Sequence, residues 1–379
     1  MELIFGILVG LLILVFLVVV HELGHAIVAH HSGVVVEEFG IGFPPKVWAK
    51  KLKSGVLFTI NWLPLGGFVK LQGENDASSK KGDYGAASFL VKTKILFAGV
   101  LVNWLAAVVL LTILALTGLP KILPNQFSVA GDTTTQLQPV RLASLVDGYP
   151  AAAAGFEQGD TILLFDGKKV ETTDSLINLT KQYRGKTVEI FYSRNNIEAE
   201  KTVTLKNNDK ANFGAGLSQQ ERTKSTWSAP IVGIVTTGQF TLATFQGLGD
   251  LVTNLGKGIF LQLSPNDTTR QQAKEDLDTV GGSVAGPIGI LGVIFPSAQR
   301  AGLTELTFLT AIISLSLAVM NVLPIPALDG GRWFLMVIFR LRKKVLTKEK
   351  EEKIVGISFM VLMALIVVVT ISDVGKLFK

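Results

Sequence analysis

All four histidines of this chain lie between positions 21 and 31, directly after an uncharged run from Leu3 to Val20. The first five residues of this segment, His21 to His25, have the pattern H-E-x-x-H. On a helix the two histidines stand one turn apart on the same face, so both imidazoles can bind one zinc ion. Glu22 lies beside them, where it can take a proton from an attacking water. The spacing therefore predicts a zinc-dependent hydrolytic site.

A polar cluster at the end of a membrane span is the alternative interpretation, because histidines also lie at the level of lipid headgroups. His30 and His31 suit that interpretation. The motif from His21 to His25 suits it poorly, since the apolar residues 26–29 continue the helix beyond it. Ionisable residues within an apolar helix are energetically costly and usually mark a functional site.

The composition indicates an integral membrane protein that also carries a water-soluble part. Of all residues 48% are hydrophobic and only 17% are charged, and the mean hydropathy is +0.44. The net charge of +6 does not imply a nucleic-acid partner, because the lysines and arginines lie largely in two loops beside apolar runs. The chain has no cysteine, which excludes disulfides and thiolate metal sites. Glu2 stands where a signal peptide would have a cation, so we expect the first run to be a retained helix.

Four uncharged stretches are long enough to cross a bilayer, which requires about 20 apolar residues. We expect transmembrane helices at 1–31, 94–119, 306–323 and 354–372. The connecting segments 32–93 and 332–353 are rich in lysine and arginine, and the positive-inside rule places both on the cytoplasmic side. Both termini and the long segment between the second and third spans then face the extracytoplasmic side.

A fifth apolar stretch, 229–251, is broken by glycines and carries Asp250 near its end. A fifth span at this point would put the two cationic loops on opposite sides of the membrane. We therefore expect amphipathic or re-entrant helices at the outer surface across 226–300. The pattern leaves open whether 229–251 enters the membrane.

The first cytoplasmic segment, 32–93, has β character. Short strand-like runs are separated by turn residues, among them Gly40, Gly42 and Gly66-Gly67. One interpretation is an ordinary β-hairpin. The other is an edge strand near the catalytic site that holds a substrate segment by backbone hydrogen bonds.

The clearest sign of a soluble domain lies at Pro150 to Ile162, where a helix of small residues leads through a turn into an apolar strand. Asp166-Gly167 then predicts a hairpin. The segment 137–207 resembles a PDZ domain of bacterial envelope proteases, and this resemblance implies an extended peptide ligand bound as an added strand. The alternative is a small β-rich domain without a ligand.

A tetrahedral zinc site needs a third protein ligand besides the two histidines, and no histidine remains for it outside the membrane edge, so we expect Asp or Glu. The third span ends in a segment from Asn321 to Arg332 that contains two prolines, two glycines and Asp329. Asp329 is a carboxylate at the cytoplasmic end of an apolar helix, on the membrane face that the histidines approach. The alternative is an aspartate that caps the following helix, 330–341.

Several motifs together resemble the site-2 proteases, the zinc intramembrane metalloproteases, and in particular the bacterial branch that cleaves anti-sigma factors and carries a periplasmic PDZ domain. The resemblance follows the chain in order and covers nearly its whole length. The matching segments are His21–His25 (H-E-x-G-H), Pro64–Lys70 (P-L-G-G-Y-V-K), Ala285–Pro287 (the G-P element) and Asn321–Gly331 (N-x-x-P-x-P-x-L-D-G-G).

This resemblance implies a Zn2+ ion bound by His21, His25 and Asp329, with Glu22 as the catalytic base. It also implies a substrate-site role for Asn321.

For the hairpin, the resemblance implies membrane association around Gly40, Gly42 and Phe43, which become substrate-binding candidates. The family's second span usually carries G-P-x-x-N, whereas Gly99 to Asn103 has Val100 in place of the proline. Asn103 is therefore either a further substrate-site residue or a buried interhelical hydrogen-bonding residue.

We expect a polytopic α-helical membrane protein with four transmembrane helices, a membrane β-hairpin on the cytoplasmic side and an inserted extracytoplasmic PDZ domain of β-rich α+β type. The resemblance implies a bacterial inner-membrane endopeptidase. Its expected partners are single-span membrane protein substrates, membrane lipid and a peptide ligand of the PDZ domain, with no nucleic acid. The rival interpretations are an inactive membrane scaffold that binds partners through its PDZ domain, and a transporter or channel with an intramembrane metal site.

Overall fold

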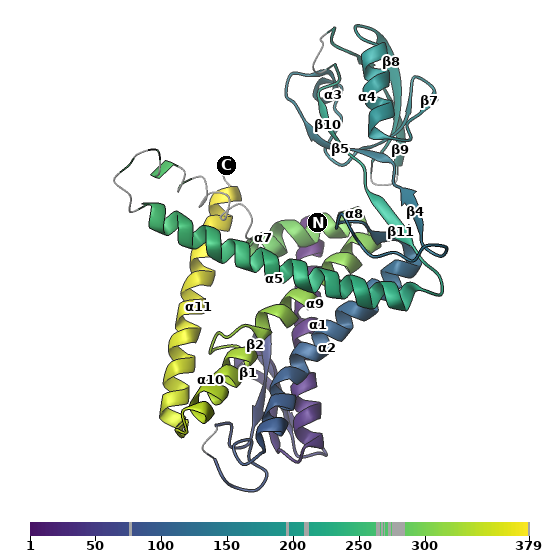
Figure 1. Cartoon of the computed structure of the whole chain (residues 1–379). Helices are drawn as coiled ribbons and strands as arrows, with labels where there is room; N and C mark the ends of the chain where they lie inside the picture. Colours follow the sequence, from purple (N-terminus) through teal and green to yellow (C-terminus); the bar gives the residue numbers. More distant parts are fainter. Residues whose placement is uncertain are drawn as a thin grey trace. The chain divides into compact units, whose positions relative to one another are not determined.

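The computed structural model describes residues 1–75, 78–194, 197–207, 212–262, 266, 268, 270–271, 274 and 285–377 of the 379-residue chain. The chain divides into two compact units (Figure 1). The helical unit comprises Met1–Leu111 and Gly233–Lys379, and the β unit comprises Thr112–Val232.

Within the described residues, four helices are long and apolar enough to cross a membrane. They are α1 (Glu2–His31), α2 (Phe89–Thr117), α9 (Leu303–Val322) and α11 (Lys348–Leu377). Each overlaps one of the four stretches expected from the sequence. The helices α2 and α11 start several residues earlier than those stretches, because backbone hydrogen bonding continues into the charged residues beside the apolar core of a span.

The stretch 229–251, for which amphipathic or re-entrant helices are expected, lies within one continuous helix, α5 (Ala229–Gln262), of 34 residues. It crosses the neighbouring helices in Figure 1. The indole of Trp104 on α2 donates a hydrogen bond to Thr241 Oγ1 (3.1 Å), and the rings of Phe240 and Phe308, on α9, lie 5.7 Å apart. A helical glycine costs about 1 kcal/mol relative to alanine, yet α5 is continuous through its glycines, and these contacts pack it against α2 and α9.

The remainder of the 226–300 stretch lies partly outside the described residues. Its described end forms α7 (Pro287–Gly289), the π-helix η1 (Ile290–Ile294) and α8 (Phe295–Ala301). A Cβ added at Gly6 or Gly10 of α1 would meet Pro296 or Phe295 at under 3 Å. Small residues therefore let α8 lie directly against α1, as they do in membrane helix pairs.

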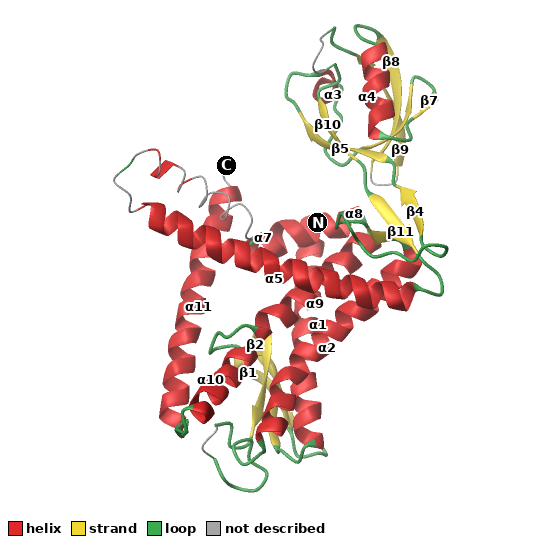
Figure 2. Ribbon diagram, viewed as in Figure 1, coloured by secondary structure: helices red, strands yellow, loops and turns green. Residues whose placement is uncertain are grey.

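The cytoplasmic hairpin consists of β1 (Val36–Lys51) and β2 (Leu57–Leu71) (Figure 2). The sequence predicts an edge strand near Gly42 as one interpretation, and the register shows which stretches are unpaired. Residues 38–41 have β2 partners on both sides, at 67–70 and at 57–60. The stretch 67–71 is paired only with β1 among the described residues. The hairpin folds back on itself at Gly42 and Gly66, both with positive φ. Among the described residues its two free edges are therefore 67–71 of β2 and 46–51 of β1, which pairs only with 57–61.

The third span ends where the prolines begin. Leu323, before Pro324, is extended (φ −61°, ψ 148°), as expected for a residue that precedes proline. The chain re-enters a helix at α10 (Asp329–Leu341). Cβ atoms at Gly330 and Gly331 would collide with backbone carbonyls of the preceding turn, so only glycine allows this tight return.

The β unit has one main sheet, in the order β10-β5-β6-β8-β9 with β7 on β6, and a small sheet in the order β3-β11-β4. Its elements are β3 (Leu119–Pro120), β4 (Thr134–Leu137), β5 (Val140–Leu145), α3 (Pro150–Ala153), β6 (Thr161–Phe165), β7 (Lys168–Lys169), α4 (Thr173–Gln182), β8 (Thr187–Arg194), β9 (Ile197–Thr204), β10 (Ala215–Ser218) and β11 (Glu221–Lys224). Alternate strand residues such as Val140, Ile162 and Ile190 form a buried core. Because β10 pairs with β5, the domain extends beyond the expected end at 207.

Candidate functional site

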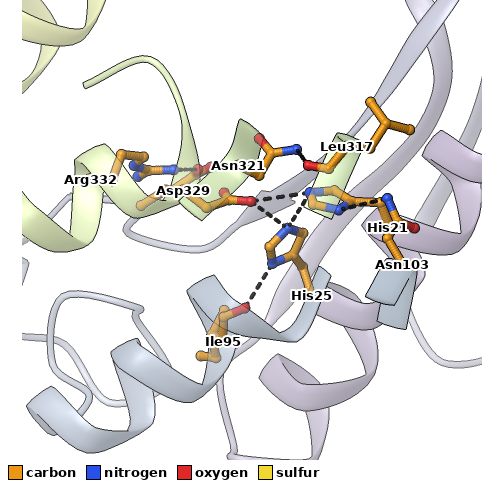
Figure 3. Close-up of polar contacts among 9 residues, drawn as sticks. His21, His25, Ile95, Asn103, Leu317, Asn321, Asp329 and Arg332 are labelled. Atoms are coloured by element: carbon orange, nitrogen blue, oxygen red, sulfur yellow. Dashed lines mark hydrogen bonds and ion pairs between the residues drawn. The ribbon is translucent and has the colours of Figure 1, made fainter. Parts of the chain in front are cut away.

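Three side chains from two distant parts of the chain meet inside the helical unit (Figure 3). The Nε2 atoms of His21 and His25 lie 3.1 Å and 3.3 Å from Asp329 Oδ2, and 3.1 Å from each other. Zinc–ligand bonds of about 2.0–2.1 Å in a tetrahedron separate ligand atoms by about 3.3 Å. The three ligand atoms have close to this spacing, so the residues fit a zinc ion that would take the place of the protons they otherwise share.

The two histidines lie on α1 at helical spacing, and both are buried, with 7% of His21 and 8% of His25 exposed. The Nδ1 atom of His25 donates a hydrogen bond to the backbone carbonyl of Ile95 on α2 (2.7 Å). This bond fixes the ring so that Nε2 points toward Asp329, which is the usual role of groups behind a metal-ligating histidine.

Close packing of α1 on α2 depends on two glycines. A Cβ at Gly24 of α1 would lie 2.8 Å from the carbonyl oxygen of Ala98, and a Cβ at Gly99 of α2 would lie 2.7 Å from His21 Cε1. Neither helix can therefore carry a side chain at this point. From the sequence, Gly99 is known only as part of the match to G-P-x-x-N, and its contact with the histidines and the role of the Ile95 carbonyl were not predicted. Their signal is the spacing 95, 99, 103, which places all three residues on one face of α2.

Asp329 is held at the site by the break between α9 and α10. Burial by itself would raise the pKa of its carboxyl group, but hydrogen bonds with His21 and His25 outweigh burial and hold that pKa below its ordinary range. One helical turn further on, Arg332 pairs with Glu74 (2.8 Å) and lies 3.6 Å from Glu351. Through Arg332 the helix that carries Asp329 is tied to Glu74, just after the hairpin, and to α11.

Glu22 lines a polar cavity of about 180 Å³ together with His25 and Asp329. The opposite wall includes Phe68 and Val69 from the free edge of β2. The cavity therefore brings together a carboxylate that can act as a base, the ligand cluster and an unpaired strand edge.

The other residues predicted from the sequence lie in different surroundings. Asn103 is fully buried, and its Nδ2 lies 3.4 Å from His21 Nδ1. Asn321 donates to the Leu317 carbonyl of its own helix (2.9 Å), so no direct contact with the ligand cluster is seen in the described structure. His31 is exposed and bonds to the Ile27 carbonyl, away from the cluster.

The three hairpin candidates do not touch the ligand cluster in the described contacts. Gly40 packs under the ring of Phe68, and Gly42 has φ +75° in a turn against Leu63. Phe43 is 44% exposed at the far end of the hairpin.

Two histidines one helical turn apart, a carboxylate from a distant helix and an adjacent glutamate define a zinc-type metallohydrolase site, here carried on a membrane-length helix. Residues 9–365 match the model described as peptidase family M50. The chain belongs to this family, the site-2 protease family, and it is a zinc metalloprotease.

Relatives match over nearly the whole chain. A protein of Clostridium perfringens (strain 13 / Type A) is 32% identical, covering 94% of this chain and 95% of the relative. The regulator of sigma-W protease RasP of Bacillus subtilis (strain 168) is 26% identical, covering 96% of each chain. Among solved structures, the PDZ domain of an SdrC-like protein from Listeria monocytogenes is 25% identical over 24% of this chain and 93% of that domain, with a TM-score of 0.20.

Proposed function

We propose that this metalloprotease cleaves a peptide bond within the transmembrane segment of single-span membrane proteins. The observation that carries the proposal is the position of the proposed ligands His21 and His25 on α1, an apolar helix of membrane-spanning length. The Bacillus subtilis relative is named as a regulator of sigma-W, which supports an anti-sigma factor as one class of substrate. Remnants of signal peptides are a second class with the same single-span form.

In this proposal His21, His25 and Asp329 hold the zinc ion. When bound, zinc acidifies a water molecule and polarises the scissile carbonyl group. Glu22 accepts the proton of the attacking water and then delivers it to the leaving amide nitrogen. The cavity beside Glu22 supplies the route by which water reaches the buried ligand cluster.

The free edge of β2 at 67–71 is proposed as the surface that holds the substrate. A transmembrane helix keeps its peptide groups in internal hydrogen bonds, so the scissile segment must unwind before it can react. An unwound segment regains those bonds by pairing with a sheet edge. The edge at 67–71 lines the same cavity as Glu22, whereas Gly40 already has strand partners on both sides.

The proposed topology places the hairpin and the α10–α11 connection in the cytoplasm of a bacterium, since both are cationic. Both termini and the β unit then lie outside the inner membrane, with lipid around the four spans. We propose that the β unit is a PDZ domain that takes an extended peptide along β10. That strand is one of the two outer strands of its sheet, with β9 at the other edge, and Asn212 just before it bonds to the Thr180 carbonyl of α4 (3.0 Å).

The proposal is tested with the purified full chain and a panel of single-span substrates in lipid vesicles. Glu22→Gln should keep about one zinc per chain but slow cleavage by about 10²–10⁴-fold, the usual contribution of a general base. His31→Gln is the matched control and should cleave at the wild-type rate, because His31 lies outside the ligand cluster. Cleavage by Glu22→Gln at the wild-type rate, or cleavage only outside the span, would contradict the proposal.

A further inference from the structure

The side chain of Asn103 is a buried amide, and in the described structure only its nitrogen atom faces a hydrogen-bonding group. It is 0% exposed on α2, and within the described structure its Oδ1 has no hydrogen-bond partner. Its Nδ2 instead faces Nδ1 of His21 at 3.4 Å. A buried carbonyl oxygen without a donor is uncommon in folded proteins and calls for a physical explanation.

The state of His21 in a zinc-loaded protein supplies that explanation. Its Nε2 points into the ligand cluster, 3.1 Å from Asp329 Oδ2. A neutral imidazole that gives Nε2 to a metal carries its proton on Nδ1. With zinc bound, Nδ1–H of His21 would therefore face the N–H donors of Asn103. Two donors repel at this distance, and a half-turn of the amide replaces the repulsion with a hydrogen bond.

We propose that Asn103 is a positioning residue for the metal site, whose Oδ1 accepts the Nδ1–H proton of His21 when zinc is bound. The inference rests on the proposed zinc ligation by His21. It assigns His21 the same kind of support that His25 receives from the Ile95 carbonyl at 2.7 Å. Ile95 and Asn103 then hold the two imidazoles from one face of α2, on either side of Gly99.

A purely structural role for Asn103 can be separated from this one. Its backbone carbonyl accepts a hydrogen bond from Ser314 Oγ on α9 (2.9 Å), and Ser314 is also 0% exposed. That bond joins the helices without involving the Asn103 amide. Ser314→Ala therefore disturbs the packing around Asn103 and leaves the proposed acceptor in place.

The test is zinc affinity, measured on the purified full chain by competition with a chromophoric chelator. Asn103→Leu keeps the branched shape of the side chain but has no acceptor, and it should weaken zinc binding by about 10–100-fold, as loss of such support does elsewhere. Asn103→Asp keeps an acceptor and should bind zinc at least as tightly as the wild type. Ser314→Ala should change affinity by less than about threefold. Wild-type affinity in Asn103→Leu, or an equal loss in the Leu and Asp variants, would overturn the inference.

A second measurement needs no variant and so does not depend on the folding of Asn103→Leu. Loaded with cobalt, the wild-type protein should show two hyperfine-shifted imidazole N–H protons that exchange slowly with solvent, one from each histidine. A single slow proton would mean that Nδ1 of His21 has no acceptor and would overturn the inference. Failure of the wild-type chain to bind zinc or cobalt at all would instead contradict the proposed metal site itself.

Discussion

A single methyl group at position 99 should destroy tight zinc binding. A Cβ on Gly99 would lie 2.8 Å from His21 Nε2 and closer still to His25 Nε2, whereas ordinary contact begins at 3.4 Å. His21 must therefore retreat by about 0.6 Å, the difference between 3.4 and 2.8 Å, while zinc–ligand distances tolerate only about 0.2 Å.

Neither helix can absorb this displacement easily, because Gly24 already places α1 against the Ala98 carbonyl. Since both histidines move, we expect Gly99→Ala to weaken zinc binding by at least about 100-fold, or about 2.7 kcal/mol. The assay is chelator competition on the purified full chain, with circular dichroism to show that the helices are retained.

The matched control is Gly247→Ala in α5, where an added Cβ meets no atom within 4 Å. Alanine favours a helix over glycine by about 0.8–1.0 kcal/mol, so this variant should be at least as stable as the wild type and bind zinc normally. If Gly99→Ala binds zinc within about threefold of the wild type, the contact between Gly99 and the histidines does not position the ligands, and the reasoning fails.

Three further predictions concern stability. Adding zinc at 100 times its Kd to the metal-free protein should stabilise the helical unit by about 2.7 kcal/mol, seen as slower hydrogen exchange in α1 and α10; equal protection with and without metal would contradict the site. Arg194→Met should destabilise the β unit by about 2–3 kcal/mol in urea unfolding, because the buried Asp160 carboxylate loses its guanidinium partner, which holds it through two bonds of 2.7 Å. The control Lys169→Met, at an exposed ion pair, should change the free energy of unfolding by less than about 0.5 kcal/mol. Hydrogen bonds from Ser228 and Thr226 lower the pKa of Asp132 from 3.8 to about 2. Its stabilising contribution is therefore complete above about pH 4 and lost as pH falls toward 2. Pepsin cutting near 226–229, expressed relative to cutting of an unfolded reference peptide in the same mixture, should increase over that range, and Asp132→Asn should remove this relative increase.

Much of the site was predictable because its signals are local. The spacing of His21 and His25 depends only on the helical repeat, and the prolines after Asn321 end a helix wherever they occur. The pattern at 229–251 left open whether this stretch enters the membrane, because the contacts of α5 with α2 and α9 come from residues far away in sequence.

The strand pairing of the hairpin likewise could not be predicted from the sequence. Its turn residues were visible in the sequence, but the pairing of residues 38–41 on both sides depends on how the two halves of β2 fold around β1. A shift in strand pairing leaves the composition unchanged. The pattern of residues therefore could not show which stretches of the hairpin form its free edges.

The sequence by itself determined the kinds of ligand, the four apolar spans and the cationic loops, since each depends on residue type and short-range period. Only the tertiary structure decided that Asp329 meets His21 across 308 residues, and that Gly99 and Asn103 lie against the histidines from α2. Those contacts arise from helix packing, in which a missing side chain at Gly24 and Gly99 sets how closely two helices approach. Such distances are a property of the packed pair and not of either helix alone.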